Sequence, residues 1–173
     1  MDCKIKSIIF SIFILIIGIN AKAQVLNQSL QSLRGINKAA IVVETFNQNL
    51  HDSGLKEEEI RNDAWFELQS AGITILNEKA SHDISGSPYL YINIGAVKSK
   101  NDNMYAVSIN VEFRQDVLLL RDDKIKYYGA STWSRSSIGI FTKDKISEVR
   151  KFTKEIVASF VKDYLVANKM NNN

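Results

Sequence analysis

The sequence has few of the residues on which thiol chemistry, nucleophilic catalysis and metal binding depend. One cysteine, two histidines and one proline occur among 173 residues. The cysteine is Cys3, which precedes the first apolar run of the chain. Downstream of that run there is no residue for a disulfide, a thiol nucleophile or a thiolate metal ligand. At about 150 residues, that part of the chain is long enough to fold around a hydrophobic core without a disulfide.

Recognisable catalytic motifs are also missing. The chain has no glycine-rich phosphate loop, no Gly-x-Gly-x-x-Gly turn and no Gly-x-Ser-x-Gly elbow. His51 and His82 each lie in a polar segment beside an aspartate, and adjacent residues do not build a metal site alone. We therefore assign no catalytic residue, no metal ligand and no cofactor, although folding could still bring either histidine to a serine.

The first 23 residues have the three-part order of a cleavable secretory signal peptide. Lys4 and Lys6 precede an uncharged run over Ile8–Ile19, and Ala21-Lys22-Ala23 supplies small residues for cleavage before Gln24. As a helix this run measures about 18 Å, too short for a hydrocarbon core of roughly 30 Å. We expect an exported protein, periplasmic or secreted, with no membrane span after cleavage. Because no cysteine follows the run, we expect no lipoprotein.

The formal charge of +3 belongs mostly to that leader. Residues 1–23 hold three lysines and one aspartate, which leaves 19 basic and 18 acidic residues in the remainder. A nearly neutral domain has no general attraction for nucleic acid or anionic lipid. We therefore expect no nucleic-acid partner and look for an envelope protein instead, with the oligomeric state left open.

Two segments have apolar residues at helical spacing. The first runs over 55–71, with Ser53-Gly54 as its start signal, Glu57-Glu58-Glu59 in its first turn and Gly72 at its end. The second runs over 142–167. The apolar stripes of the two helices consist of Ile60, Ala64, Leu68 and Ala71, and of Ile146, Val149, Thr153, Ile156, Phe160 and Tyr164.

Five strands are expected, over 39–43, 73–76, 89–97, 105–120 and 126–140, with the polar stretches 47–54 and 77–88 as loops. The fourth alternates most clearly, which predicts one buried and one wet face. A continuous apolar stretch after it predicts a bulge near Gln115-Asp116. On this strand we expect Val107, Ile109 and Val111 to be buried and Ser108, Asn110 and Glu112 to be exposed.

Together these elements predict an α+β fold in the order β-α-β-β-β-β-α. The expected architecture is a two-layer sandwich, with a mainly antiparallel sheet that is at least partly a meander and with two helices on one face. The domain organisation follows: a signal peptide over 1–23, a lead-in segment over 24–38, one domain over 39–168 and a flexible tail over 169–173.

The uncovered face of such a sheet is the candidate binding surface. Aromatic and arginine side chains are typical anchors of interfaces, and Tyr91, Arg114, Trp133 and Arg135 are the residues we select. The alternative is that Trp133 fills the core while the arginines are simply solvated, because large aromatic side chains are usually buried.

The order of these elements resembles a known type of protein. The residues that carry the resemblance are Ala71-Gly-Ile73, Pro88-Tyr-Leu-Tyr-Ile-Asn-Ile94, Val117-Leu-Leu-Leu120, Ala130-Ser-Thr-Trp133 and Asp163-Tyr-Leu165. The chain resembles small exported α/β domains of bacterial envelopes and, more distantly, the amino-terminal domain of the TolB type. The resemblance implies a periplasmic, non-catalytic accessory role and no particular site residue. The propeller of TolB proteins has no counterpart in this sequence.

The sequence therefore favours an exported, non-enzymatic envelope accessory or binding module. Its open sheet face or sheet edge would accept the partner. Two alternatives stay open: a small-ligand carrier, which needs a sizeable apolar cavity, and a small hydrolase that uses His51 or His82 with a serine.

Overall fold

The computed structural model describes residues 30–100 and 103–169. The predicted signal peptide, its cleavage site and most of the tail lie outside these residues. The described elements follow one another as β1 (Lys38–Val43), α2 (Gln48–His51), α3 (Glu57–Ser70), β2 (Thr74–Leu76), α4 (Glu78–His82), β3 (Tyr89–Lys98), β4 (Met104–Leu119), β5 (Asp122–Thr142), the 3-10 turn η1 (Lys143–Lys145) and α5 (Glu148–Lys169).

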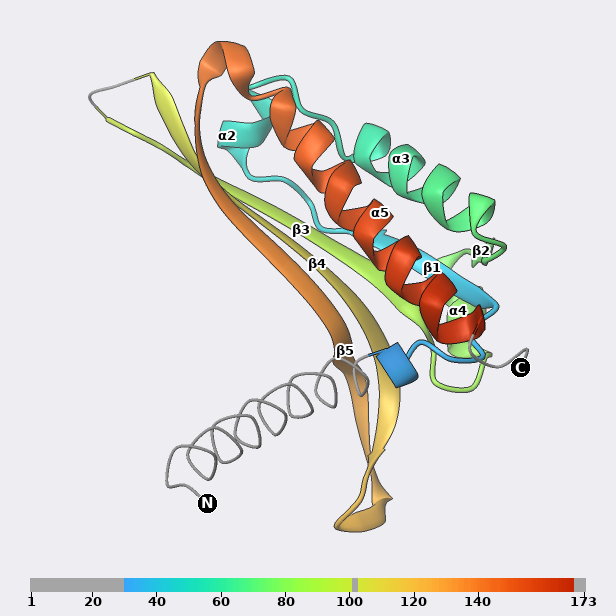
Figure 1. Ribbon diagram of the computed structural model, residues 1–173. Coiled ribbons are helices and arrows are strands. Elements are labelled where there is room, and N and C mark those ends of the chain that lie inside the picture. The colour runs from blue at the N-terminus through green and yellow to red at the C-terminus, as the bar shows by residue number, and fades with distance from the viewer. Residues whose placement is uncertain (1–29, 101–102, 170–173) are drawn as a thin grey trace, which may run out of the picture.

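The five strands form one mixed sheet in the order β2-β1-β3-β4-β5. β1 runs parallel to both β2 and β3, whereas β3, β4 and β5 form an antiparallel meander. The two long helices, α3 and α5, lie side by side over one face of the sheet (Figure 1). The predicted α+β fold with two helices against a largely antiparallel sheet is therefore confirmed.

The alternation of β4 places its side chains as predicted. Val107, Ile109 and Val111 are buried and Ser108 is exposed, while Asn110 and Glu112 are half-buried because they hydrogen bond to neighbours on the open face. The pairing of β4 with β5 shifts register between Phe113 and Arg114 and again between Gln115 and Val117. The bulge expected from the change of phase in the sequence is thus present.

Helix α3 begins later than predicted. Its first residue is Glu57, after Lys56, and the expected start signal at Ser53 acts elsewhere: the Ser53 hydroxyl donates to the Leu50 carbonyl, 2.6 Å away, at the end of α2. The three glutamates do occupy the first turn, where carboxylates meet the positive end of the helix dipole. Gly72 follows the helix with a φ of +88°, the left-handed conformation predicted for it.

Two predicted loops are wrong in part, because each contains a short helix. In α2 the Asn47 side chain accepts from the Leu50 amide, and in α4 the Asn77 side chain accepts from the Ala80 amide. One helical turn is too short to show a periodic apolar pattern, so only the asparagine caps could have indicated these helices. The last helix also differs, since β5 extends to Thr142 and α5 begins only at Glu148.

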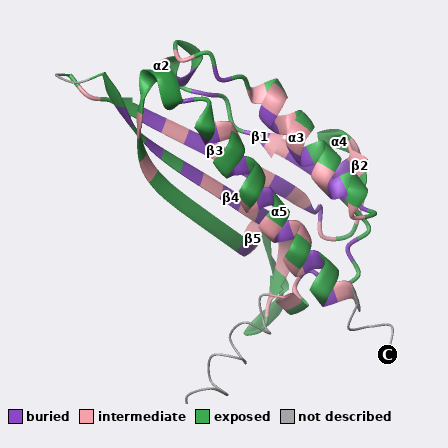
Figure 2. Ribbon diagram, turned by 45° about the horizontal axis from the view of Figure 1, so that its top comes forward, coloured by how far each residue is buried: buried purple, intermediate pink, exposed green. Residues whose placement is uncertain are grey.

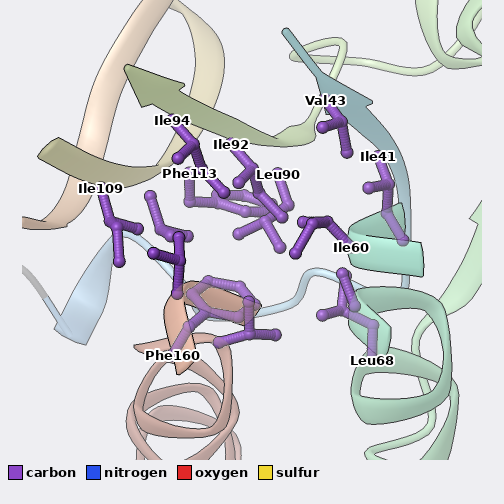
Figure 3. Packing of buried hydrophobic residues seen from close by; sticks show 14 of the residues in the cluster. Ile41, Val43, Ile60, Leu68, Leu90, Ile92, Ile94, Ile109, Phe113 and Phe160 are labelled. Carbon is purple, nitrogen blue, oxygen red and sulfur yellow. The ribbon is translucent and has the colours of Figure 1, made fainter. Parts of the chain in front are cut away.

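The core lies between the sheet and the two helices (Figure 3). Phe160 of α5 is fully buried and stacks on Phe113 of β4, with ring centroids 5.1 Å apart. Trp133 of β5 meets the same Phe160 ring edge-on at 5.1 Å, and Tyr164 packs on its other side. Aromatic contacts therefore attach α5 to the strands that it covers, while Ile60 and Leu68 of α3 fill the core toward β1 and β3.

An arginine on α5 joins the two helices at the surface. Arg150 Nε and Nη2 donate to the two carboxylate oxygens of Asp63 at 2.6 and 3.0 Å, and Nη1 donates to Glu59 Oε2 at 2.8 Å. A two-pronged arginine–carboxylate contact is among the stronger side-chain interactions in proteins. The hydrogen bonds from Arg150 hold the pKa of Asp63 below its ordinary value of 3.8, outweighing the opposite effect of burial.

We expect Arg150→Met to lower the free energy of unfolding by about 1 kcal/mol at pH 7, a modest value because water screens the pair. Asp63 has a lowered pKa in the folded state. Its contribution is therefore complete above pH 3.8 and is lost as the pH falls through the folded value. Urea unfolding at pH 7 and pH 3 should show the wild-type advantage shrinking in acid. A pH-independent difference, or an equal loss in the control Lys151→Met, would contradict this assignment.

Candidate functional site

The face of the sheet opposite the helices carries a connected set of polar side chains. Tyr91 Oη on β3 donates to Glu44 Oε2, 2.6 Å away, just beyond the end of β1. The Arg114 guanidinium of β4 lies over the Tyr91 ring, 3.8 Å from its centroid. The same arginine donates through Nε to Glu112 Oε2 at 2.7 Å. These contacts thus connect Glu44 after β1 with β3 and β4.

The connection continues to the edge of the sheet. Asn110 Nδ2 donates to the other oxygen of Glu112, and Ser136 Oγ of β5 donates to Asn110 Oδ1 at 2.7 Å. Asn93 Nδ2 also donates to Tyr91 Oη. The members come into contact because the register sets Tyr91 opposite Glu112 and Asn110 opposite Ser136. We call this set the open-face network: Glu44, Tyr91, Asn93, Asn110, Glu112, Arg114 and Ser136.

Glu112 and Tyr91 of the open-face network each keep one ionisation state around neutral pH. Burial alone would raise the pKa of Glu112, but hydrogen bonds from Arg114 and Asn110 outweigh it and lower that pKa below 4.5. The hydrogen bond to Glu44, together with burial, raises the pKa of Tyr91 above 10. Glu112 is therefore a carboxylate, and Tyr91 keeps its proton as a hydrogen-bond donor. Such a pair of groups presents defined charges and donors to a partner, without a group poised to transfer a proton.

One end of the open face is apolar. Val97 of β3 is 71% exposed, and Ile138 and Ile140 of β5 are 82% and 73% exposed. The register places Val97, Ala106 and Ile140 in one row across three strands, with Ile138 in a neighbouring row. We call Val97, Ile138 and Ile140 the apolar end. It extends the open-face network into a mixed surface of the kind found at protein interfaces.

The structure divides the four predicted binding residues between the two faces of the sheet. Tyr91 and Arg114 lie together in the open-face network. Trp133 is 5% exposed on the helix-covered face, where its indole Nε1 donates to Asp163 of α5 at 3.0 Å. Arg135 pairs with the same carboxylate at 3.3 Å. Trp133 therefore fills the core, as the alternative interpretation of the sequence held. The four predicted binding residues do not form one surface.

The histidines lie apart from the open-face network. His51 is exposed, and its Nε2 lies 3.4 Å from Glu57 Oε1. His82 lines a surface cleft of about 500 Å³ whose other lining residues include Ser85, Ser87, Asp116 and Lys126. Two serines of β5 donate elsewhere, Ser131 to the Trp133 carbonyl and Ser136 to Asn110.

The structure also bears on whether the described part of the chain could hold a small ligand or a metal ion. The hollow between α3 and α5 has no room for a water molecule, whereas typical ligand pockets measure roughly 300–1,000 Å³. In the described part of the chain, no three acidic, histidine or cysteine side chains cluster as metal ligands would. No helix within residues 30–100 and 103–169 is long and apolar enough to cross a membrane.

Comparison with known proteins finds distant likeness alone. No family model matches the chain, and no curated protein matches it. Two solved structures of PelC dodecamers from Paraburkholderia phytofirmans are 17% identical, with TM-scores of 0.43 and 0.39, and cover 75% of this chain and 87% and 86% of their own. A minor lipoprotein from Acinetobacter baumannii is 7% identical over 75% of this chain and 90% of its own, with a TM-score of 0.35. None of the three is described as a TolB-type domain, and likeness at this level assigns no function.

Proposed function

We propose that this protein is an exported, non-enzymatic module of the bacterial envelope that binds another envelope protein through its open sheet face. The observation that carries the proposal is the open-face network, which joins four strand regions on the face of the sheet opposite α3 and α5 (Figure 1). The leader-like residues 1–23 support the exported location, and the layout similar to small exported domains and the TolB amino-terminal type supports the accessory role.

The physical argument rests on preorganisation. The Arg114 side chain is stacked on Tyr91 and tied to Glu112, so little rotamer entropy remains to be lost when a partner covers it. Arginine and tyrosine are also the residues that most often dominate binding energy at protein interfaces. The neighbouring apolar end would contribute burial, while the polar members would set the orientation of the partner.

The carrier and hydrolase alternatives have less support from the geometry. A carrier needs an apolar cavity. The cleft of about 500 Å³ at His82 mixes Val117 and Leu118 with charged side chains, and a second cleft of about 500 Å³ mixes Ile41 and Leu76 with Arg61, Glu78 and Lys79. A hydrolase needs a histidine hydrogen bonded to its nucleophile. The hydrogen bonds of Ser131 and Ser136 go to other groups, and among the described residues Ser85 and Ser87 line the His82 cleft without a hydrogen bond to the imidazole. Protein binding is therefore the function that the arrangement favours.

In-cell crosslinking of the tagged protein, followed by affinity capture from the envelope fraction and mass spectrometry, tests the proposal. We expect one dominant partner at near-stoichiometric yield. Arg114→Ala should reduce its capture about tenfold or more, as for an interface anchor, while thermal unfolding changes little. Arg34→Ala, which removes an exposed arginine outside the sheet, is the matched control. No partner, or equal capture with Arg114→Ala, would reject the proposal.

A further inference from the structure

β5 is exposed on more sides than the other strands of the sheet. The strand order places it at an edge, so it hydrogen bonds with β4 along one side only. α5 contacts β4, and of the 21 residues of β5 only Trp133 is buried (Figure 2). Residues 30–100 and 103–169 therefore leave both faces of β5 and one row of its backbone groups uncovered over much of its length.

The two halves of this edge differ in how they are protected against pairing with a further strand. The half near the β4–β5 turn carries Asp122, Asp123, Lys124 and Lys126, and it is interrupted by register shifts. Farther along, the Ser32 hydroxyl donates to the Thr132 carbonyl at 3.1 Å. From Trp133 to Thr142 the only charged residue is Arg135, and there is no proline. Charges, prolines and bulges are the usual means by which edge strands avoid pairing, and of these the second half has only the charge of Arg135.

We propose that a second copy of this chain pairs with this half of β5, antiparallel to it, about a two-fold axis that passes through Ile138. The two edges of the sheet support this choice of occupant. β2 at the opposite edge has three residues, so head-to-tail stacking of sheets would leave most of β5 uncovered. The strand that matches β5 in length is another β5, and pairing of identical edges gives a closed two-fold dimer.

The side chains fit this register. With the axis through Ile138, each Ile138 lies directly opposite Ile138 of the second copy, and Ile140 is its diagonal neighbour across the interface. Ile138 and Ile140 of both copies lie on the open face, so pairing joins the apolar ends of the two copies into one apolar surface. Arg135 lies opposite Phe141 of the second copy, so the one charge on each strand meets no like charge. The near-neutral domain adds no general repulsion between copies.

The first test is sedimentation equilibrium of the purified exported protein over a range of concentrations. We expect a monomer–dimer equilibrium, and we expect Ile138→Lys to weaken dimerisation about tenfold or more, because two lysines then face each other across the axis. Phe66→Lys is the matched control. It also replaces an exposed apolar side chain by lysine, but on α3 and outside the sheet.

The second test uses the scarcity of cysteine. In a Cys3→Ser background, Ile138→Cys should form a disulfide between copies, since directly opposed residues have Cα atoms about 4.5–5.5 Å apart, within disulfide range. Val97→Cys lies two strands from the edge and should stay unlinked. The crosslink also tests the register if Ile138→Lys disturbs folding.

Two results would overturn the dimer. One is a chain that stays monomeric at every concentration with no Ile138→Cys disulfide. The other is a dimer whose affinity is unchanged by Ile138→Lys and which is not trapped by Ile138→Cys, because that dimer would use another surface. The inference does not depend on the proposed envelope partner, since it needs only the purified chain.

Discussion

Phe160→Ala is expected to lower the free energy of unfolding by about 3–5 kcal/mol, the usual cost of truncating a fully buried aromatic side chain. For a domain of this size, the midpoint of thermal unfolding should fall by about 10–15 °C. The cause is local and identifiable. The Phe160 ring lies between Phe113 and Trp133 of the sheet and Tyr164 of its own helix, so its removal leaves three aromatic rings without their common neighbour.

The matched control is Phe66→Ala on α3. Phe66 has the same side chain, but it is 63% exposed. Its truncation should therefore change the free energy of unfolding by less than about 0.5 kcal/mol. Urea unfolding of both variants, followed by circular dichroism, measures the difference. Similar losses in the two variants would mean that α5 is not attached to the sheet through Phe160.

The sequence was most informative where a single strand or helix carried a regular pattern. Strict alternation over residues 105–113 identified the buried face of β4. Successive side chains of a strand point to opposite faces, so the apolar set had to be the buried one. Helical spacing likewise identified Ile60, Ala64 and Leu68, all of which are buried. Local patterns failed at Ser53, whose hydroxyl had a competing carbonyl at the end of α2, a helix too short to be recognised.

Sequence reasoning selected only two of the seven residues of the open-face network. Tyr91 and Arg114 were selected by residue type, whereas Glu44, Asn93, Asn110, Glu112 and Ser136 were not. Their contacts depend on which residues face one another across strands, as Tyr91 faces Glu112, and that register is set by the pairing of the whole sheet. Trp133 was ambiguous for a related reason: serines precede and follow it on both faces of β5, so no alternation indicated which face was buried.

The role of Trp133 can be separated from that of the open face by two substitutions at that position. Trp133→Ala should cost about 3–5 kcal/mol, because the buried indole packs edge-on against the Phe160 ring beneath α5. Trp133→Phe keeps a ring in that space and loses the N–H donor to Asp163. That carboxylate also binds Arg135 and is partly solvated, so the expected cost is only about 1–2 kcal/mol.

Partner capture then separates folding from recognition. At a temperature where Trp133→Phe is fully folded, it should capture the envelope partner as well as the wild type does, whereas Arg114→Ala should not. The reason is that the Trp133 side chain packs beneath α5 and the Arg114 side chain lies on the uncovered face. If Trp133→Phe lost capture while Arg114→Ala kept it, the binding surface would have to include the helix side of β5, and the open-face network would be a stabilising feature of the sheet alone.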